Sequence, residues 1–331
     1  MGEGIGSGQP LRIGVLGAAR IAPMALVAPA RRTGVARVVA VAARDPGRAR
    51  TFAARHGIPI VAESYEALLA HPDVDAVYNP LPNSLHAVWT IRALEAGRHV
   101  LCEKPFAATA AEARSMAAAG ERSGRVLMEA FHYRYHALFE RVLAAVRGGD
   151  IGPLRHVEAR FVIPIVRAGD IRWRRELAGG ALMDAGCYAM SMVRHVAGTE
   201  PEVTAASARW TRGGVDRWTQ ADLRFPGDVT GRITCSLLSF PPLAIALVVR
   251  GDRGTVRVFN PVAPQFMNRL RISTPNGTRA ERVRGEPSYD MQLRAFVAAV
   301  RDGRPFPTDP RDAIGNMAAI DSVYAAARRG G

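Results

Sequence analysis

Residues 11–22, LRIGVLGAARIA, decide the fold of the first part of the chain. An apolar run ends at Gly17, and an alanine-rich run that predicts a helix follows at once. A turn of this kind lets backbone N–H groups and the start of the helix hold a pyrophosphate. Gly17 takes the first glycine position of the dinucleotide fingerprint, and Ala19 and Ala22 replace the other two. An ordinary tight turn is the alternative. The predicted cofactor-binding residues of this turn are Gly17, Ala18, Ala19, Arg20 and Ile21.

The rhythm of the chain predicts an α/β protein with two domains. Up to about residue 131, short apolar runs alternate with alanine-rich stretches, which indicates a parallel Rossmann sheet. The later part has consecutive strand-like runs without helices between them, which predicts an α+β domain with an open, mainly antiparallel sheet. We expect a flexible tail at 1–10, the Rossmann domain at 11–131 and a substrate-binding and oligomerisation domain at 132–331. The strands expected in the second domain are Val203–Trp210, Trp218–Phe225, Thr230–Phe240, Ile245–Arg250, Thr255–Phe259, Arg269–Ser273 and Arg279–Val283.

Composition excludes several classes of protein. The 331 residues are 48% hydrophobic and 22% charged, as in a globular protein, and no apolar run is long enough to span a membrane. The net charge of +14 is spread over scattered arginines, which argues against a nucleic-acid partner. The three cysteines have no metal-ligand spacing, so we expect no metal site and a reduced, cytoplasmic setting.

The end of the second predicted strand favours NADP over NAD. An NAD site needs a carboxylate here for the ribose hydroxyl, whereas an NADP site needs a cation. Ala43 leaves the acidic position empty, and Arg44 and Arg48 offer guanidinium groups for the 2′-phosphate. Asp45 keeps NAD open as the alternative.

Two further segments carry residues suited to catalysis. Lys104 is the one lysine among 44 basic residues, and it follows the fifth predicted strand, whose carboxyl end faces the ligand crevice of a parallel sheet. Pro105 makes a cis peptide bond possible. Asp184 and Tyr188 lie four residues apart on a predicted helix and share one face, behind the pair Gly179-Gly180, which permits close approach of a ligand. A helix with a satisfied buried aspartate and a core tyrosine is the alternative.

These segments resemble the glucose–fructose oxidoreductase, inositol dehydrogenase and rhizopine catabolism (Gfo/Idh/MocA) family. The matching pieces are Gly17–Ala22, Asn79–His86, Glu103–Pro105 and Gly180–Tyr188, in the family's order and spacing. The resemblance covers residues 11 to 328. It implies a nicotinamide cofactor, a sugar-like substrate, and a homodimer or homotetramer formed through the C-terminal sheet.

The resemblance also implies roles for individual residues. Lys104 corresponds to the catalytic lysine, Asp184 to the carboxylate that orients the substrate, and Tyr188 to the proton-exchanging group. Many relatives have a histidine at that last position, and the tyrosine resembles the branch of pentose dehydrogenases, trans-dihydrodiol dehydrogenases and keto-sugar reductases. We expect the Lys104 ammonium to lower the pKa of the phenol. The further cofactor contacts implied are Pro80, Leu81, Asn83, His86, Glu103, Lys104 and Trp173. The further substrate contacts are Lys104, Phe131, Arg134, Arg172 and Tyr289.

The sequence therefore predicts an NADP-dependent dehydrogenase or reductase that acts on a sugar, a sugar derivative or a cyclic diol. A glycosidase that uses the nicotinamide without net redox change is one alternative. A sensor that binds NADP without catalysis is the other. The substrate and the direction of hydride transfer stay open.

Overall fold

The computed structural model describes residues 8–167, 169–240 and 242–329. The first seven residues of the expected N-terminal tail lie outside the described residues. The chain divides into two compact units, Met1–His132 with Tyr289–Ala313, and Tyr133–Ser288 with Ile314–Gly331. The division cuts helix α9 after Ala313.

The first unit is built on a six-stranded sheet in which all neighbouring strands are parallel, in the order β3-β2-β1-β4-β5-β6. This order reverses between β1 and β4, which is where an open α/β sheet forms its ligand crevice. The strands are β1 (Leu11–Leu16), β2 (Ala36–Ala42), β3 (Ile60–Val61), β4 (Ala76–Asn79), β5 (His99–Cys102) and β6 (Leu127–Glu129).

The helices of the first unit begin and end where local sequence dictates. The side chains of Asp45, Ser64 and Thr109 each accept from N–H groups of the helix that follows. Gly57 and Gly124 end two of these helices in the left-handed conformation. The helical segments are η1 (Pro23–Val27), α1 (Ala28–Thr33), α2 (Pro46–His56), α3 (Tyr65–Ala70), η2 (Asn83–Leu85), α4 (His86–Glu95), α5 (Ala110–Ser123) and η3 (His132–Tyr135), which runs across the boundary between the units.

Residues 289–313 return to the first unit, which the sequence-based division at residues 131 and 132 does not include. Helix α8 (Ser288–Asp302) brings the carboxylate of Asp290 to the guanidinium of Arg32, with Nε and Oδ2 2.8 Å apart. Farther along, the Glu129 N–H donates to the carbonyl of Thr308 over 3.1 Å. These contacts join residues more than 170 positions apart, which no local pattern reveals.

The second unit contains an eight-stranded sheet in the order β14-β13-β12-β11-β7-β10-β9-β8. Its pairs are antiparallel except β7 with β10. The strands are β7 (Leu154–Val162), β8 (Glu202–Trp210), β9 (Asp216–Phe225), β10 (Val229–Ser236), β11 (Ala244–Gly251), β12 (Gly254–Phe259), β13 (Arg269–Thr274) and β14 (Gly277–Glu281).

The strand expectations for this unit missed β7, which lies near the middle of the sheet. Its apolar residues Val157, Ala159 and Phe161 are buried and alternate with polar side chains, including Glu158 and Arg160, that form an ion pair of 2.7 Å. This alternation is itself the signal of a strand with one buried face, so the sequence contains evidence for β7 that the expected strands did not include.

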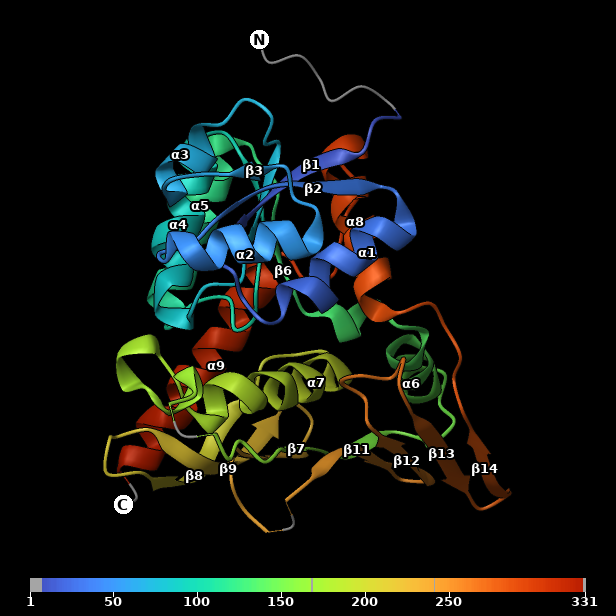
Figure 1. The fold of residues 1–331 in the computed structure, drawn as a ribbon. Helices are drawn as coiled ribbons and strands as arrows, with labels where there is room; N and C mark the ends of the chain where they lie inside the picture. The colour runs from blue at the N-terminus through green and yellow to red at the C-terminus, as the bar shows by residue number, and fades with distance from the viewer. Residues whose placement is uncertain (1–7, 168, 241, 330–331) are drawn as a thin grey trace. The chain divides into compact units, whose positions relative to one another are not determined.

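Helices cover one face of the second sheet. Figure 1 shows α6 (Ala137–Arg147) and α7 (Cys187–Ala197) on the same side of the strands. Helix α7 packs against β7 and β10, and α6 packs against β12. The remaining helical segments are η4 (Ile171–Trp173), η5 (Arg175–Leu177), η6 (Leu182–Gly186) and α9 (Pro310–Arg329). Within the described ranges, no helix is both long and apolar enough to cross a membrane.

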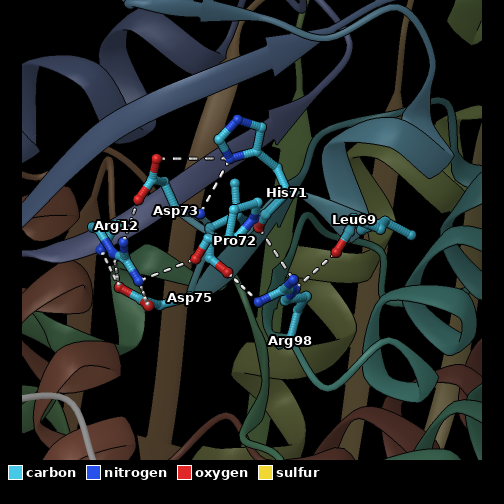
Figure 2. A network of polar contacts seen from close by, with 8 residues as sticks. Arg12, Leu69, His71, Pro72, Asp73, Asp75 and Arg98 are labelled. Carbon is cyan, nitrogen blue, oxygen red and sulfur yellow. Dashed lines mark hydrogen bonds and ion pairs between the residues drawn. The ribbon is translucent and has the colours of Figure 1, made fainter. Parts of the chain in front are cut away.

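Two arginines organise the turn between α3 and β4. Arg98 donates to the carbonyl groups of Leu69, His71 and Val74, at distances of 2.8, 3.1 and 2.5 Å. Figure 2 shows Arg98 beside Leu69 and His71, with Arg12 and Asp75 close by. Burial lowers the pKa of Arg98. The neighbouring Arg12 makes a two-pronged contact with Asp75, of 3.0 and 2.7 Å.

We expect Arg98→Met to destabilise the first unit by about 2–3 kcal/mol, because it removes a charged donor from three carbonyl groups. Native-state hydrogen exchange in β1 and β4 measures this free energy of opening. Arg50→Met, on the exposed side of α2, is the matched control. Equal opening energies in the two variants would show that Arg98 does not stabilise the turn.

Candidate functional site

The turn after β1 requires a glycine. Gly17 has a φ of +88°, and a Cβ built on it would lie 3.0 Å from Cδ2 of Leu81. Its N–H donates to the carbonyl of Ala42 over 2.6 Å, which fixes the turn against β2. The helical segment η1–α1 starts at Pro23, six residues after this glycine. This geometry fits a dinucleotide phosphate, which needs a close backbone and a helix start.

The residues that follow β2 include an exposed arginine, Arg44, and an aspartate, Asp45, that caps the next helix. Arg44 is exposed, and the preceding position is Ala43. Oδ1 of Asp45 accepts from the N–H groups of Gly47 and Arg48, at 2.8 and 3.2 Å, as the cap of α2. A capping carboxylate is less suited to accept from a ribose hydroxyl, so this end of the strand fits the 2′-phosphate of NADP.

Tyr65 belongs to this corner and was missed by the sequence analysis. Its hydroxyl oxygen lies 3.9 Å from the position of a Cβ on Gly17, and its ring packs edge-on against Trp89 at 4.7 Å. Burial raises the pKa of Tyr65, while a hydrogen bond from the backbone of Arg44 and the charges of Arg44 and Arg48 lower it. The only sequence signal was its place as the first residue of a capped helix.

Lys104 lies in a loop whose backbone is fixed by the buried carboxylate of Glu103. The Glu103 carboxylate accepts from the hydroxyl of Tyr78 over 2.6 Å and from the N–H of Lys104 over 3.2 Å. Glu103 is buried and Lys104 is half-buried. The Lys104–Pro105 peptide bond is cis, as the sequence allowed. The loop therefore gives the lysine backbone a fixed position after β5.

His86 lies behind this loop and bridges two backbone segments. Its Nδ1 is 2.8 Å from the carbonyl of Pro105, and its Nε2 is 2.7 Å from the carbonyl of Leu81. Burial lowers the pKa of His86 to about 4, against the two carbonyl groups, which raise it. Both ring nitrogens thus lie against backbone carbonyl groups of the protein, and a contact of His86 with the cofactor stays a prediction. Pro80 and Leu81 are buried, while Asn83 is half-buried.

Two predicted substrate residues of the first unit are buried aromatics. Phe131 is fully buried. Tyr289 stacks on His132 with ring centroids 4.0 Å apart, and burial raises its pKa.

The helix that carries Asp184 and Tyr188 begins with a π-helical turn, Leu182–Gly186, and continues as α7. Such turns occur often at functional sites. Tyr188 is 5% exposed and packs between Tyr133 and Phe161, with ring centroids at 5.9 and 5.3 Å.

Arg172 contacts the predicted catalytic carboxylate. Its Nε lies 2.7 Å from Oδ2 of Asp184, and its Nη1 lies 3.1 Å from Oδ1 of Asp170. Asp184 is the largest of the causes that raise the pKa of Arg172. The guanidinium thus contacts both carboxylates, Asp184 and Asp170. The adjacent Trp173 donates from Nε1 to the carbonyl of Ile165 over 3.2 Å.

Arg134, the other predicted substrate arginine, lies in the second unit against Phe139 and His195. The guanidinium is 5.5 Å from the Phe139 ring and contacts Nε2 of His195.

The glycine pair before this helix has a reason other than ligand approach. A Cβ on Gly179 would lie 2.4 Å from the carbonyl oxygen of Arg172, and one on Gly180 would lie 2.1 Å from Oδ1 of Asp216. Gly180 also has a φ of +139°. Protein atoms therefore fill the space that the sequence analysis left for a ligand.

Comparisons with known proteins agree with this geometry. The family described as an oxidoreductase family with an NAD-binding Rossmann fold (GFO_IDH_MocA) matches residues 11–131, and its C-terminal domain matches residues 139–257. The NADP-dependent D-xylose 1-dehydrogenase 2 of Haloferax volcanii is 36% identical, over 97% of this chain and 98% of its own. A dTDP-3,4-didehydro-2,6-dideoxy-α-D-glucose 3-reductase of Streptomyces violaceoruber is 36% identical, over 94% and 92%.

A solved structure shares the whole fold. The 3-ketoreductase of Actinomadura kijaniata, crystallised with NADP and TDP-benzene, superimposes with a TM-score of 0.90 at 30% identity, over 96% of this chain and 98% of that one. Both family domains are present in order, and these relatives match nearly the full chain. The resemblance seen in the sequence is confirmed: the chain belongs to the Gfo/Idh/MocA family of oxidoreductases.

Proposed function

We propose that this protein is an NADP-dependent oxidoreductase that transfers a hydride between nicotinamide C4 and a carbon–oxygen group of a sugar, a sugar derivative or a cyclic diol. The observation that carries the proposal is the joint presence of the phosphate-binding turn at Gly17 and the three reactive side chains Lys104, Asp184 and Tyr188. The activities of the xylose dehydrogenase and of the keto-sugar reductases support the same class of substrate.

The chain's own residues divide the work of binding and proton transfer. The turn at Gly17 holds the pyrophosphate, and Arg44 pairs with the 2′-phosphate. When bound, NADP(H) supplies or accepts the hydride. Lys104 stabilises the negative charge that develops on the substrate oxygen. Tyr188 donates a proton to that oxygen during reduction and accepts the proton from it during oxidation.

Asp184 orients the substrate by accepting from one of its hydroxyl groups. The contact with Arg172 holds one oxygen of this carboxylate in place. The other proposed cofactor contacts are Ala18, Ala19, Arg20, Ile21, Arg48, Pro80, Leu81, Asn83, Glu103 and Trp173. The other proposed substrate contacts are Phe131, Arg134 and Tyr289.

The open face of the second sheet supports assembly into a homodimer or homotetramer. This face has a shallow hollow of about 190 Å³ whose lining mixes charged and aliphatic side chains, Glu158, Arg160, Ala246, Val248, Arg250 and Arg257. Burying a sheet face of this kind against a second copy completes a layer. Sedimentation velocity distinguishes this assembly from a monomer. Three buried free thiols support a reduced, cytoplasmic location.

The function is tested by mixing the protein with NADPH and a panel of keto-sugars, with NADP⁺ and the matching alcohols, and with aryl glycosides. A change of absorbance at the nicotinamide band in the first two mixtures supports the proposal. Glycoside cleavage without that change would indicate a glycosidase. Cofactor binding without either reaction would indicate a sensor.

We expect wild-type protein to bind NADPH more tightly than NADH, and Arg44→Ala to weaken NADPH binding by about 10- to 100-fold, because one charge-assisted contact contributes about 1.5–3 kcal/mol. Nicotinamide fluorescence titration measures both dissociation constants. NADH affinity, which does not depend on the 2′-phosphate, is the internal control. A wild type that prefers NADH would show that Asp45 reads the ribose.

We expect Lys104→Met to fold normally and to lose at least about 100-fold in turnover, the usual effect of removing a positioned charge. Because Lys104 is the one lysine of the chain, reductive methylation followed by mass spectrometry also reports on this side chain alone. Bound NADPH should slow its methylation, with the N-terminal amine as the unprotected control. Near-normal turnover in the folded variant would remove Lys104 from the reaction.

We expect Tyr188→Phe to keep the packing of the ring and to lower turnover by roughly 10²- to 10⁴-fold, because only the hydroxyl is removed. Tyr188→His should recover part of the rate, with a pH profile that moves toward the imidazole pKa of about 6.5. Tyr133→Phe, which also removes a buried hydroxyl, is the control for nonspecific loss. An unchanged rate and pH profile in Tyr188→Phe would leave proton transfer to another group.

A further inference from the structure

A buried carboxylate at the first residue of β9 is not used by the proposed reaction. Asp216 is 1% exposed. Its Oδ2 accepts from the N–H of Leu182 over 2.8 Å and from the hydroxyl of Thr219 over 2.7 Å, and its Oδ1 accepts from the hydroxyl of Tyr324 over 2.8 Å. Burial raises the pKa of Asp216, and these three donors lower it. Three donors on one buried carboxylate indicate a site that the fold maintains.

One of these donors is the start of the helix that carries the reactive residues. The N–H groups of the first turn of a helix have no partner inside the helix. Leu182 lies in that turn, two residues before Asp184, and the N–H of Asp184 closes the turn by donating to Gly180 over 3.0 Å. Asp216 therefore acts as the cap of this helix, from a strand 34 residues farther along the chain.

Gly180, just before the helix, has no side chain that would block the approach of the Asp216 carboxylate. A Cβ on Gly180 would lie 2.1 Å from Oδ1 of Asp216 and 2.9 Å from the hydroxyl oxygen of Tyr324. The other side of the turn is fixed as well, because the N–H of Gly179 donates to Arg174 over 3.0 Å and its Cα faces the carbonyl of Arg172. The start of the helix is thus fastened between β9 and the segment that supplies the arginine partner of Asp184.

We infer that Asp216 is a positioning residue of the reaction: by capping the helix start at Leu182 it sets where Asp184 and Tyr188 stand relative to Arg172 and to the substrate. This inference rests on the proposed function, because it concerns the side chains to which that function assigns catalysis. Tyr324, on α9, and Thr219 hold Asp216 in turn. A displacement of about 1 Å at reacting groups can lower a rate by about 100-fold. Loss of the cap at Leu182 therefore affects turnover if it shifts Asp184 and Tyr188 by such a distance.

Two substitutions at Asp216 distinguish the loss of the helix cap from a change in the charge of the side chain. Asp216→Ala removes the cap, whereas the carbonyl of Asp216→Asn still accepts from Leu182 and Thr219, and its NH₂ group donates to the Tyr324 oxygen. Asp222→Ala is the matched control, because Asp222 lies on the same strand and contacts Arg232, 2.6 Å away. The variants are compared by kcat and KM for the sugar and by the dissociation constant of NADPH.

We expect Asp216→Ala to lower kcat by about 10- to 100-fold and to raise KM for the sugar several-fold. NADPH affinity should change much less than kcat, because every proposed cofactor contact except Trp173 belongs to the other unit. Asp216→Asn should recover most of kcat, and Asp222→Ala should behave as wild type. An alanine variant with normal kcat, or an asparagine variant no better than alanine, would overturn the inference.

A second measurement needs no turnover. In hydrogen exchange of the free protein, the segment 182–188 should exchange at least about 10-fold faster in Asp216→Ala than in Asp222→Ala, because the capped N–H loses its partner. Equal exchange in the two variants would overturn the inference on its own. If wild type reduced no sugar while this segment still responded to Asp216, the proposed function would fail and the capping role would stand.

Discussion

The first N–H groups of a helix need partners outside that helix, and the candidate sites of both units follow from this requirement. In the first unit the turn at Gly17 leads from β1 to the helical segment that starts at Pro23, and this turn is the candidate phosphate site. In the second unit the helix start at Leu182 is satisfied by the protein's own carboxylate, Asp216. The same physical need thus serves ligand binding in one unit and the placement of side chains in the other.

The two helix starts also explain why similar glycines have different meanings. Gly17 and Gly180 both adopt positive φ values at a strand–helix or loop–helix junction. A Cβ on Gly17 would lie 3.0 Å from the flexible end of Leu81 and 3.9 Å from the Tyr65 hydroxyl, whereas one on Gly180 would lie 2.1 Å from a hydrogen-bonded carboxylate oxygen. Only the first glycine leaves room beside it. The sequence around Gly17 and Gly180 does not distinguish these two cases, because the atoms that face them lie 36 positions or more away along the chain.

Much of the fold follows from local sequence. The helices Pro46–His56, Tyr65–Ala70 and Ala110–Ser123 each begin directly after a capping side chain, whose hydrogen bonds reach no farther than three residues along the chain. Strand β7 was not foreseen although its residues alternate between apolar and polar. The return of α8 to the first unit was not foreseen because it depends on long-range contacts such as Arg32 with Asp290.

The candidate site likewise has residues that the sequence predicts and contacts that only the structure shows. Motifs of the family brought out Lys104, Asp184 and Tyr188, while long-range contacts decide what surrounds them. Arg172 was expected at the substrate, yet its ion pair with Asp184 is visible only in the folded chain, as is the cap at Asp216, which is 108 residues from Tyr324. Tyr65 is similar, because its link to Gly17 and Arg44 crosses from α3 to the ends of two strands.

Hydride transfer to the carbon of a carbonyl is the central claim, and an isotope measures it directly. The protein is incubated with NADPH carrying deuterium at the transferable C4 position and with a keto-sugar that it accepts, and the product is analysed by mass spectrometry and NMR. The account predicts one deuterium in each product molecule, bound to the new carbinol carbon. Product without deuterium, or deuterium recovered in water, would contradict it.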